Sequence, residues 1–235
     1  MGLLGRLKRA VDARLLPADA RQVRAERITY LSPAKLRRLD AAAQEAMAAT
    51  PGDLLEFGVA MGGSAVLLAK KARAQGRRFA GFDVFAMIPP PTSEKDDAKS
   101  KERYEVIASG RSEGLGGDDY YGYKTNLFDE VSETFRRYGV PVDGQDVRLV
   151  KGLFEETWPT FPVEAIAFAH IDCDWYDPVK YCLEAVAEKL GPGGVIVLDD
   201  YNDYGGCRTA TDEFVAARPD FVFENGANAI LRRKR

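Results

Sequence analysis

Short runs of almost continuously apolar residues recur along this chain, and helix-like segments separate them. The runs are 53–59, 77–85, 146–152, 165–172 and 194–201. A strand that is apolar on both faces must be covered on both faces, as happens when helices connect parallel strands. The alternation therefore predicts an α/β fold in which helices cover both faces of a mostly parallel sheet.

The chain closes with two further strand-like runs, 221–225 and 229–233, joined by a short Gly-Ala-Asn link. Such a link predicts an antiparallel hairpin, because parallel strands need a much longer crossover. The hairpin brings the predicted sheet to seven strands. The Gly-Pro-Gly-Gly segment at 191–194 is expected to form a turn, and Ser32 followed by Pro33 predicts the start of a helix.

Composition excludes several classes of protein. The 235 residues are 46% hydrophobic and 29% charged, which is typical of a globular domain and not of a disordered chain or a coiled coil. No apolar run is long enough for a membrane span. The net charge of −3 argues against a nucleic-acid partner. The single histidine and three cysteines suit neither an imidazole metal site nor a disulfide scaffold, so we expect a cytoplasmic protein.

The chain divides into two parts that differ in charge and in the alternation of predicted strands and helices. Residues 1–31 are rich in Arg and Lys and are expected to be helical, with at most weak contact with a membrane surface. Residues 32–235 are expected to form one domain. Within it, 88–144 interrupts the alternation with a charged stretch and a Tyr-rich one, and we expect this segment to act as a lid. Its tyrosines Tyr120, Tyr121 and Tyr123 would supply a wall for a substrate.

A glycine-rich turn follows the first predicted strand, in Glu56-Phe-Gly-Val-Ala-Met-Gly-Gly-Ser64. Glycines allow a ligand to approach the backbone closely, and the helix start that follows favours an anionic group. The spacing matches neither a dinucleotide fingerprint nor a P-loop. Glu56 would suit a ligand with a cationic amine, such as an aminoacyl group. Asp83 ends the second strand, where folds of this kind bind ribose hydroxyls.

Four aspartates follow the fourth and fifth predicted strands: Asp172 and Asp174, then Asp199 and Asp200. The carboxyl ends of parallel strands meet at one edge of the sheet, so these carboxylates are expected to converge. With no positive neighbour, two such charges 4 Å apart would repel by about 4 kcal/mol at an effective dielectric constant near 20. A hard divalent cation relieves that repulsion, and an all-oxygen donor set suits Mg²⁺ or a similar ion.

At this point the chain resembles a known family. The segments LEFGVAMGGS, KGLFEETWP, HIDCDWYDP and GPGGVIVLDDYNDYGGCRTATDEF look like those of the macrocin O-methyltransferases. The resemblance implies a Rossmann-like class I fold that binds S-adenosylmethionine (SAM). It implies that Asp172, Asp199 and Asp200 hold Mg²⁺ or another divalent cation, with Asp174 as the general base. His170, two residues before Asp172 and deeper in the strand, is the rival base, although a buried structural imidazole is the more common role at such a position. The residues implied to line the SAM site are Glu56, Gly58, Gly62, Ser64 and Asp83, with Gly152 added to them.

The resemblance implies transfer of the methyl group of SAM to a hydroxyl of a sugar or glycoside, in a natural product or a polysaccharide. Asp174 would face the same side as Asp172 if the strand stays extended. A catechol-type phenol methyltransferase and a non-catalytic SAM-binding module remain alternatives. The expected partner is a small-molecule or glycan acceptor, and the sequence leaves a homo-oligomer open.

Overall fold

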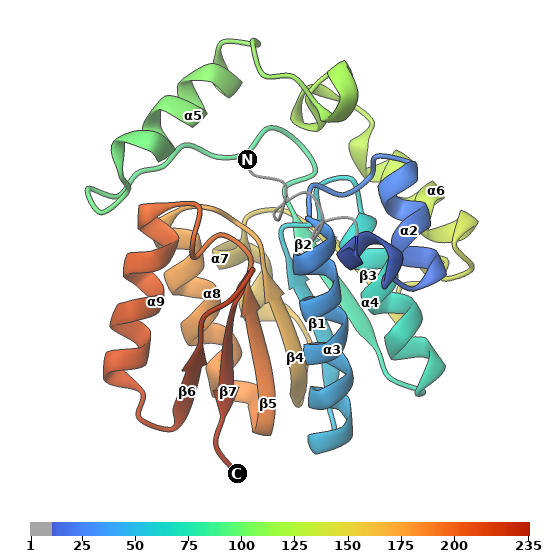
Figure 1. Ribbon diagram of the computed structural model, residues 1–235, viewed down its shortest axis with the longest axis vertical. Coiled ribbons are helices and arrows are strands. Elements are labelled where there is room, and N and C mark those ends of the chain that lie inside the picture. The colour runs from blue at the N-terminus through green and yellow to red at the C-terminus, as the bar shows by residue number, and fades with distance from the viewer. Residues whose placement is uncertain (1–10) are drawn as a thin grey trace.

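A computed structural model of the chain describes residues 11–235 and contains one seven-stranded sheet (Figure 1). Its strand order is β3-β2-β1-β4-β5-β7-β6, in which β1 to β5 pair in parallel and β7 pairs antiparallel with β5 and β6. The predicted α/β sheet and its C-terminal hairpin are thus confirmed. The strands are β1 Asp53–Phe57, β2 Phe79–Asp83, β3 Val147–Lys151, β4 Ile166–Ile171, β5 Leu190–Leu198, β6 Phe221–Glu224 and β7 Ala229–Arg233.

Helices cover both faces of this sheet. Buried residues of α2, α3, α4 and α6 share one core cluster, while those of α8 and α9 lie in the cluster on the opposite face. Alternate residues of a strand supply the two clusters: Leu54 contributes to the first and Leu55 to the second. The helices are α2 Ala18–Ala25, α3 Pro33–Ala49, α4 Gly63–Ala74, α5 Ala98–Ala108, α6 Leu127–Arg137, α7 Phe154–Thr157, α8 Tyr176–Lys189 and α9 Gly205–Ala217.

The Gly-Pro-Gly-Gly segment does not form the expected turn, because β5 already begins at Leu190. Glycine is needed here for close packing against the end of α3. A Cβ on Gly191 would lie 2.3 Å from Oγ1 of Thr50, and one on Gly193 would lie 3.0 Å from Cβ of Ala49. The segment therefore serves as the first part of a strand against which α3 ends.

The segment 88–144 contains two helices with different surroundings. Helix α6 buries Leu127, Val131 and Phe135 in the main core, beside α4. Helix α5 lies above the carboxyl ends of the strands (Figure 1). Asp97 caps α5 by accepting a hydrogen bond from the backbone N–H of Ser100 (2.9 Å).

The basic N-terminal segment is described only from residue 11 onwards, so the expectation of a helix over its first ten residues lies outside the described part. Within the described part of this segment, α2 packs Ala20 and Val23 into the core. Among residues 11–235, no helix combines the length and the apolar character that crossing a membrane requires.

Candidate metal and cofactor site

The carboxyl ends of β4 and β5 bring three aspartates together. Asp172 follows directly after β4, and Asp199 and Asp200 follow directly after β5. The two strands are in register at their ends, where Ile171 pairs with Leu198. One carboxylate oxygen from each aspartate lies within 4.8 Å of the others. The predicted convergence of these three carboxylates is therefore present in the structure.

This crowding and the loss of contact with bulk water perturb the carboxyl groups. Burial raises the pKa of Asp172 well above its ordinary value, and the charges of Asp199 and Asp200 raise it further. Burial, followed by the charge of Asp199, raises the pKa of Asp200 to about 6. Without a further positive charge, Asp172 and Asp200 thus hold a proton more tightly than ordinary carboxyl groups do.

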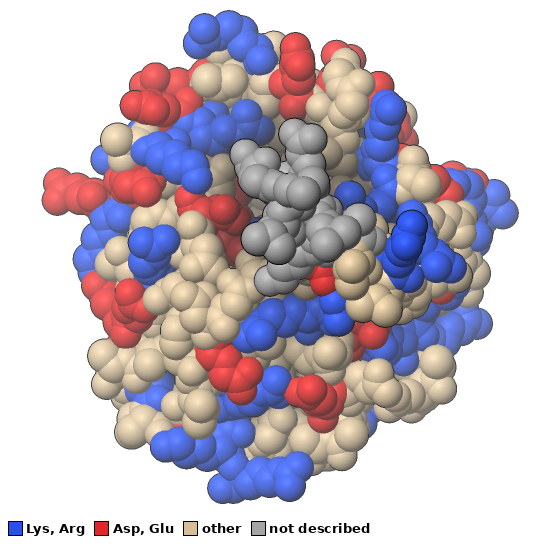
Figure 2. All heavy atoms as spheres, viewed as in Figure 1, with Lys and Arg blue, Asp and Glu red and all other residues tan. Residues whose placement is uncertain are grey.

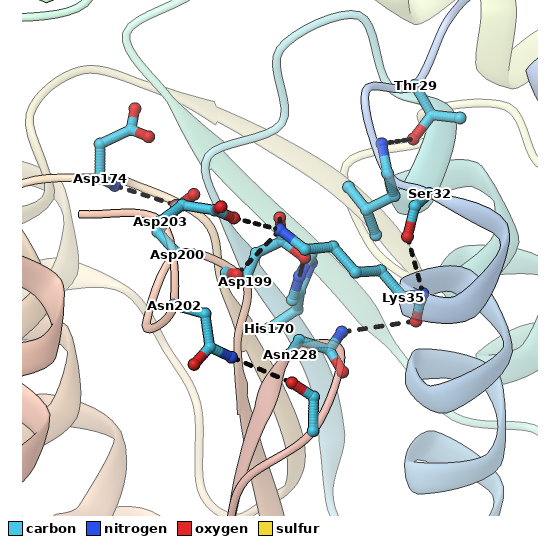
Figure 3. A network of polar contacts seen from close by, with 12 residues as sticks. Thr29, Ser32, Lys35, His170, Asp174, Asp199, Asp200, Asn202, Asp203 and Asn228 are labelled. Atoms are coloured by element: carbon cyan, nitrogen blue, oxygen red, sulfur yellow. Dashed lines mark hydrogen bonds and ion pairs between the residues drawn. The ribbon is translucent and has the colours of Figure 1, made fainter. Parts of the chain in front are cut away.

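One positive neighbour is present, which the sequence did not lead us to expect. Lys35 extends from the first turn of α3 and donates hydrogen bonds to Oδ2 of Asp199 (2.7 Å) and Oδ2 of Asp203 (2.8 Å) (Figure 3). Burial acts to lower the pKa of Lys35, but the neighbouring carboxylates, above all Asp199, hold it above its ordinary value. From the sequence, the four aspartates were considered without a positive neighbour, and Lys35 shows that this assumption was wrong.

The donor set nevertheless fits a hard divalent cation. Lys35 occupies one oxygen of Asp199, while the other, Oδ1, is buried and has no hydrogen-bond partner among the described residues. A buried carboxylate oxygen without a partner is costly and rare. Asp172 and Asp200 supply further oxygen ligands of the type that Mg²⁺ prefers.

Asp174 lies beside this cluster, but the strand does not stay extended up to it. Its φ is +59°, a left-handed conformation, so the expectation based on strand alternation was wrong. Its backbone N–H donates a hydrogen bond to Oδ2 of Asp200 (3.2 Å), which fixes the turn (Figure 3). Burial raises the pKa of the Asp174 carboxyl well above its ordinary value, with further contributions from Asp200 and Asp199.

His170 and Glu56 lie beneath the site and line neither of its cavities. The register of β1 and β4 pairs them, and Nδ1 of His170 lies 2.7 Å from Oε1 of Glu56. Both side chains are fully buried. Glu56 therefore does not face a cavity in which it could bind a cationic amine, contrary to the expectation. Nε2 of His170 lies 4.0 Å from Oδ1 of Asp199.

The glycine turn after β1 reaches the site through Gly58. Its φ is +91°, and a Cβ there would lie 1.8 Å from the backbone oxygen of Asp172. Asp83 organises the same turn: its Oδ2 accepts hydrogen bonds from the N–H groups of Val59 (2.7 Å) and Ala60 (2.9 Å), and its Oδ1 accepts one from Phe85 (2.6 Å). Asp83 lines both cavities, but these backbone contacts already use both of its oxygens.

The other residues expected at the cofactor site lie further back. Gly62 is the N-cap of α4 with φ +86°, and a Cβ there would meet Val131 of α6 at 3.0 Å. Ser64 is buried in the first turn of α4. Gly152 donates its N–H to the backbone oxygen of Asp83 (3.0 Å) and directly precedes Leu153, a cavity-lining residue. These three residues shape the edge of the sheet without lining either cavity.

Two cavities open at this edge of the sheet. The first, of about 500 Å³, extends from Gly58 towards the ends of β2 and β3 and the first turn of α8. The second, of about 330 Å³, lies between the acidic cluster, α3 and α5. The two cavities share six lining residues and are therefore two parts of one site. The shared residues are Gly58, Asp83, Tyr121, Asp172, Asp174 and Trp175.

Aromatic and basic side chains complete the second cavity. Tyr30, Tyr120, Tyr121 and Tyr204 line it, whereas Tyr123 does not line it, and its hydroxyl donates to the backbone oxygen of Ile107 (2.6 Å). Two of the three tyrosines expected to form a wall are thus in place. Lys35, Lys99 and Arg103 also line this cavity. These three residues could not be predicted from the sequence, because they belong to no local motif and come from two distant helices.

Residues 8–219 match the family model described as "Macrocin-O-methyltransferase (TylF)". The chain belongs to the macrocin-O-methyltransferase family. The resemblance noted in the HIDCD and LDDY segments is therefore confirmed. Both segments supply aspartates to the acidic cluster: Asp172 from the first, and Asp199 and Asp200 from the second.

Two curated proteins are similar to this chain. One is 8-demethyl-8-(2,3-dimethoxy-alpha-L-rhamnosyl)-tetracenomycin-C 4'-O-methyltransferase of Streptomyces olivaceus, which is 30% identical over 167 residues. The other is demethyldecarbamoylnovobiocin O-methyltransferase of Streptomyces niveus, which is 31% identical over 169 residues. The matches cover 70% and 71% of this chain, but 58% and 59% of the two relatives. The chain thus spans less than two thirds of the length of these relatives.

The solved structure of the O-methyltransferase NovP is similar to this chain, with a TM-score of 0.71 and 24% sequence identity. The match covers 88% of this chain and 82% of NovP. At this level of identity the likeness concerns the fold. The seven-stranded sheet with its antiparallel C-terminal strands is the Rossmann-like fold of class I O-methyltransferases.

Proposed function

We propose that this protein is an O-methyltransferase that transfers the methyl group of SAM to a hydroxyl of a sugar or glycoside and depends on a divalent cation. The observation that carries this proposal is the cluster of Asp172, Asp199 and Asp200, with Asp174 beside it, in a two-part cavity at the edge of a class I sheet. Membership of the macrocin-O-methyltransferase family and the glycoside names of its relatives support the choice of acceptor.

The first cavity is the proposed site for SAM. It begins at Gly58, where the missing side chain leaves the backbone open, and it extends past Asp83 to Leu153 and Phe154. Ligands of open parallel sheets bind beyond the carboxyl ends of the strands, which is where this cavity lies. The cavity would hold the methyl donor, and the second cavity, which contains the carboxylate cluster, would hold the acceptor.

Asp174 is the proposed general base. Its side chain lines both cavities, so it can reach a hydroxyl placed at their junction. His170 is less suited to this role, because it is fully buried against Glu56 and lines neither cavity.

Asp172, Asp199 and Asp200 are the proposed ligands of a divalent cation such as Mg²⁺. When bound, such an ion lowers the pKa of a neighbouring hydroxyl and fixes its position. The aspartates themselves set where an acceptor oxygen can lie, because they close one side of the second cavity. Trp175 and Tyr204, whose rings pack edge-to-face at 5.3 Å, form an adjacent wall against which an acceptor ring can lie.

The segment around α5 is the proposed lid over this site. Asp96 accepts a hydrogen bond from the N–H of Tyr176 at the start of α8 (2.8 Å), and Asp97 accepts one from Gly205 at the start of α9 (2.9 Å). These contacts fasten the lid to two helix N-termini. If the segment is a lid, SAH (the demethylated cofactor) together with Mg²⁺ will slow tryptic cleavage after Lys99 and Lys101; an unchanged cleavage rate would argue against this role.

Methyl transfer from SAM to a panel of glycosides and catechols, followed by mass spectrometry, tests the proposed function. Methylated glycosides as the main products are the expected result. Methylation of catechols alone would favour the phenol methyltransferase, since a metal also chelates their adjacent oxygens. Binding of SAM with no transfer to either class would favour a non-catalytic SAM-binding module.

A further inference from the structure

Two basic residues of α5 face the proposed acceptor cavity. Lys99 and Arg103 are four residues apart, which places them on the same side of the helix, and both line the second cavity. Figure 2 shows Lys and Arg side chains over the α5 region, above a hollow in which acidic side chains are visible. Lys99 lies over the ring of Tyr204, with Nζ 4.6 Å from its centroid, and donates to the backbone oxygen of Asp203.

Arg103 differs from the other two cations of this cavity. Lys35 pairs with Asp199 and Asp203, and Lys99 has the contacts just described. Arg103 makes no hydrogen bond or ion pair with any residue between 11 and 235; its guanidinium stacks near Tyr120, 5.6 Å from the ring centroid. A guanidinium carries five N–H donors in a planar fork that matches a carboxylate or a phosphate. Within the described part of the chain nothing pairs with that fork, and the Arg103 side chain is partly buried.

The charge of Arg103 acts on the acceptor side of the site. Arg103 lines the second cavity together with Asp174 and Tyr204. The first cavity, proposed for the cofactor, is not lined by Arg103 or Lys99. Both basic side chains therefore lie where the acceptor would bind.

We propose that Arg103, assisted by Lys99, binds an anionic group of the acceptor, so that the preferred substrate is a sugar bearing a phosphate or a carboxylate. This inference rests on the proposed function and narrows its substrate class. A neutral sugar would offer the guanidinium only hydroxyl and ring oxygens and would leave its positive charge uncompensated, which is unfavourable in a closed site. An anionic group would form charge-assisted and bidentate contacts with it.

Calorimetry on the protein saturated with SAH and Mg²⁺ tests the inference with three probes: rhamnose 1-phosphate, methyl glucuronide and the neutral methyl rhamnoside. We expect at least one charged probe to bind about tenfold more tightly than the neutral one, as a charge-assisted bidentate contact allows. Comparing the phosphate with the carboxylate identifies which anion the site prefers. Arg103→Gln should abolish the difference, and Arg103→Lys should restore part of it, because Lys keeps the charge but loses the fork.

Lys101→Gln is the matched control, since Lys101 is on the same helix but exposed and outside the cavity. It should leave all three affinities unchanged. Equal affinity of the wild-type protein for charged and neutral probes would overturn the inference, as would an unchanged difference in Arg103→Gln. A loss of SAH affinity in Arg103→Gln would also overturn it, because Arg103 would then bind the carboxylate of the cofactor.

Failure of this inference and failure of the proposed function give different results. If neutral glycosides are methylated and charged sugars bind no better, only the anionic preference is wrong. If no sugar of either kind is methylated, the proposed function is wrong, whatever the affinities are.

Discussion

Nζ of Lys35 lies 2.7 Å from Oδ2 of Asp199, although the two residues are 164 positions apart in the chain. The contact joins the first turn of α3 to the end of β5 and places an ammonium group against the proposed metal cluster (Figure 3). Both side chains are largely buried, with 16% and 7% of their surfaces exposed. Lys35 thus compensates part of the acidic charge in the absence of a metal ion.

Replacement of Lys35 should therefore make the stability of the protein depend more on divalent cations. Without metal, Lys35→Met is expected to lower the free energy of unfolding by about 2 kcal/mol, because it leaves Asp199 buried without its partner. Saturating Mg²⁺ should recover most of this loss. Urea denaturation with and without Mg²⁺ measures both values. Lys70→Met, which breaks a more exposed pair with Asp19, is the control and should show no such recovery.

The Lys35 contact also shows which features of the structure cannot be predicted from the sequence. The start of α3 at Ser32 and Pro33 was predicted from local capping chemistry, and Ser32 does accept a hydrogen bond from the N–H of Lys35 (3.2 Å). Nothing near Lys35 indicates that its side chain reaches β5, since that contact depends on how α3 packs across the sheet. Local sequence patterns predict helices and strands. Contacts between side chains that are distant in the sequence depend on how those helices and strands pack against one another.

The same distinction explains the remaining successes and errors at the site. Asp172, Asp199 and Asp200 could be placed together because strand ends of a parallel sheet share one edge. The direction of Glu56 could not be predicted, because every residue of β1 is buried and alternation gives no polar face. The left-handed φ of Asp174 could not be predicted either, since a non-glycine residue rarely adopts it.

The raised pKa of Asp200 predicts a specific pH dependence of stability. A carboxyl whose pKa is about 6 in the folded protein, and about 4 when unfolded, binds its proton more tightly in the folded state. Its contribution to stability is therefore greatest at low pH and falls as the pH rises from about 4 to about 6. In metal-free protein, Asp200→Asn should remove this penalty and be more stable than the wild type by about 2–3 kcal/mol at pH 7.

Urea denaturation of both proteins at pH 4 and pH 7, in the presence of a chelator, measures this effect. The advantage of Asp200→Asn should shrink or vanish at pH 4, where the wild-type carboxyl is protonated in the folded state and about half protonated in the unfolded state. An advantage of the same size at both pH values would mean that the ionised carboxylate is not the cause.

Gly58 should tolerate no side chain. Gly58→Ala places a Cβ where the backbone oxygen of Asp172 now lies, at φ +91°, and should lower the free energy of unfolding by about 3 kcal/mol or more. Gly76→Ala is the matched control, because Gly76 also has a positive φ, +63°, but has open space around it. It should cost only about 1 kcal/mol. Similar losses of unfolding free energy in the two variants would show that the close contact with Asp172 does not determine the cost of a side chain at Gly58.

Asp174→Asn tests the proposed general base. The substitution keeps the shape of the side chain but removes its ability to accept a proton, so turnover should fall at least about a hundredfold, as expected for loss of a general base. The affinity for SAM, measured by calorimetry, should stay within about twofold, because the amide can make similar neutral contacts. Turnover close to that of the wild type would remove Asp174 from this role.

The most direct test of the account is the rate of methyl transfer from SAM to a glycoside, measured in chelator-treated protein as Mg²⁺ is added back. The three-carboxylate site predicts almost no transfer without the ion, saturable recovery with it, and recovery shifted to much higher Mg²⁺ concentration in Asp199→Asn. Transfer at full rate in the presence of the chelator would contradict the account, because Asp172, Asp199 and Asp200 would then serve the reaction without a metal ion.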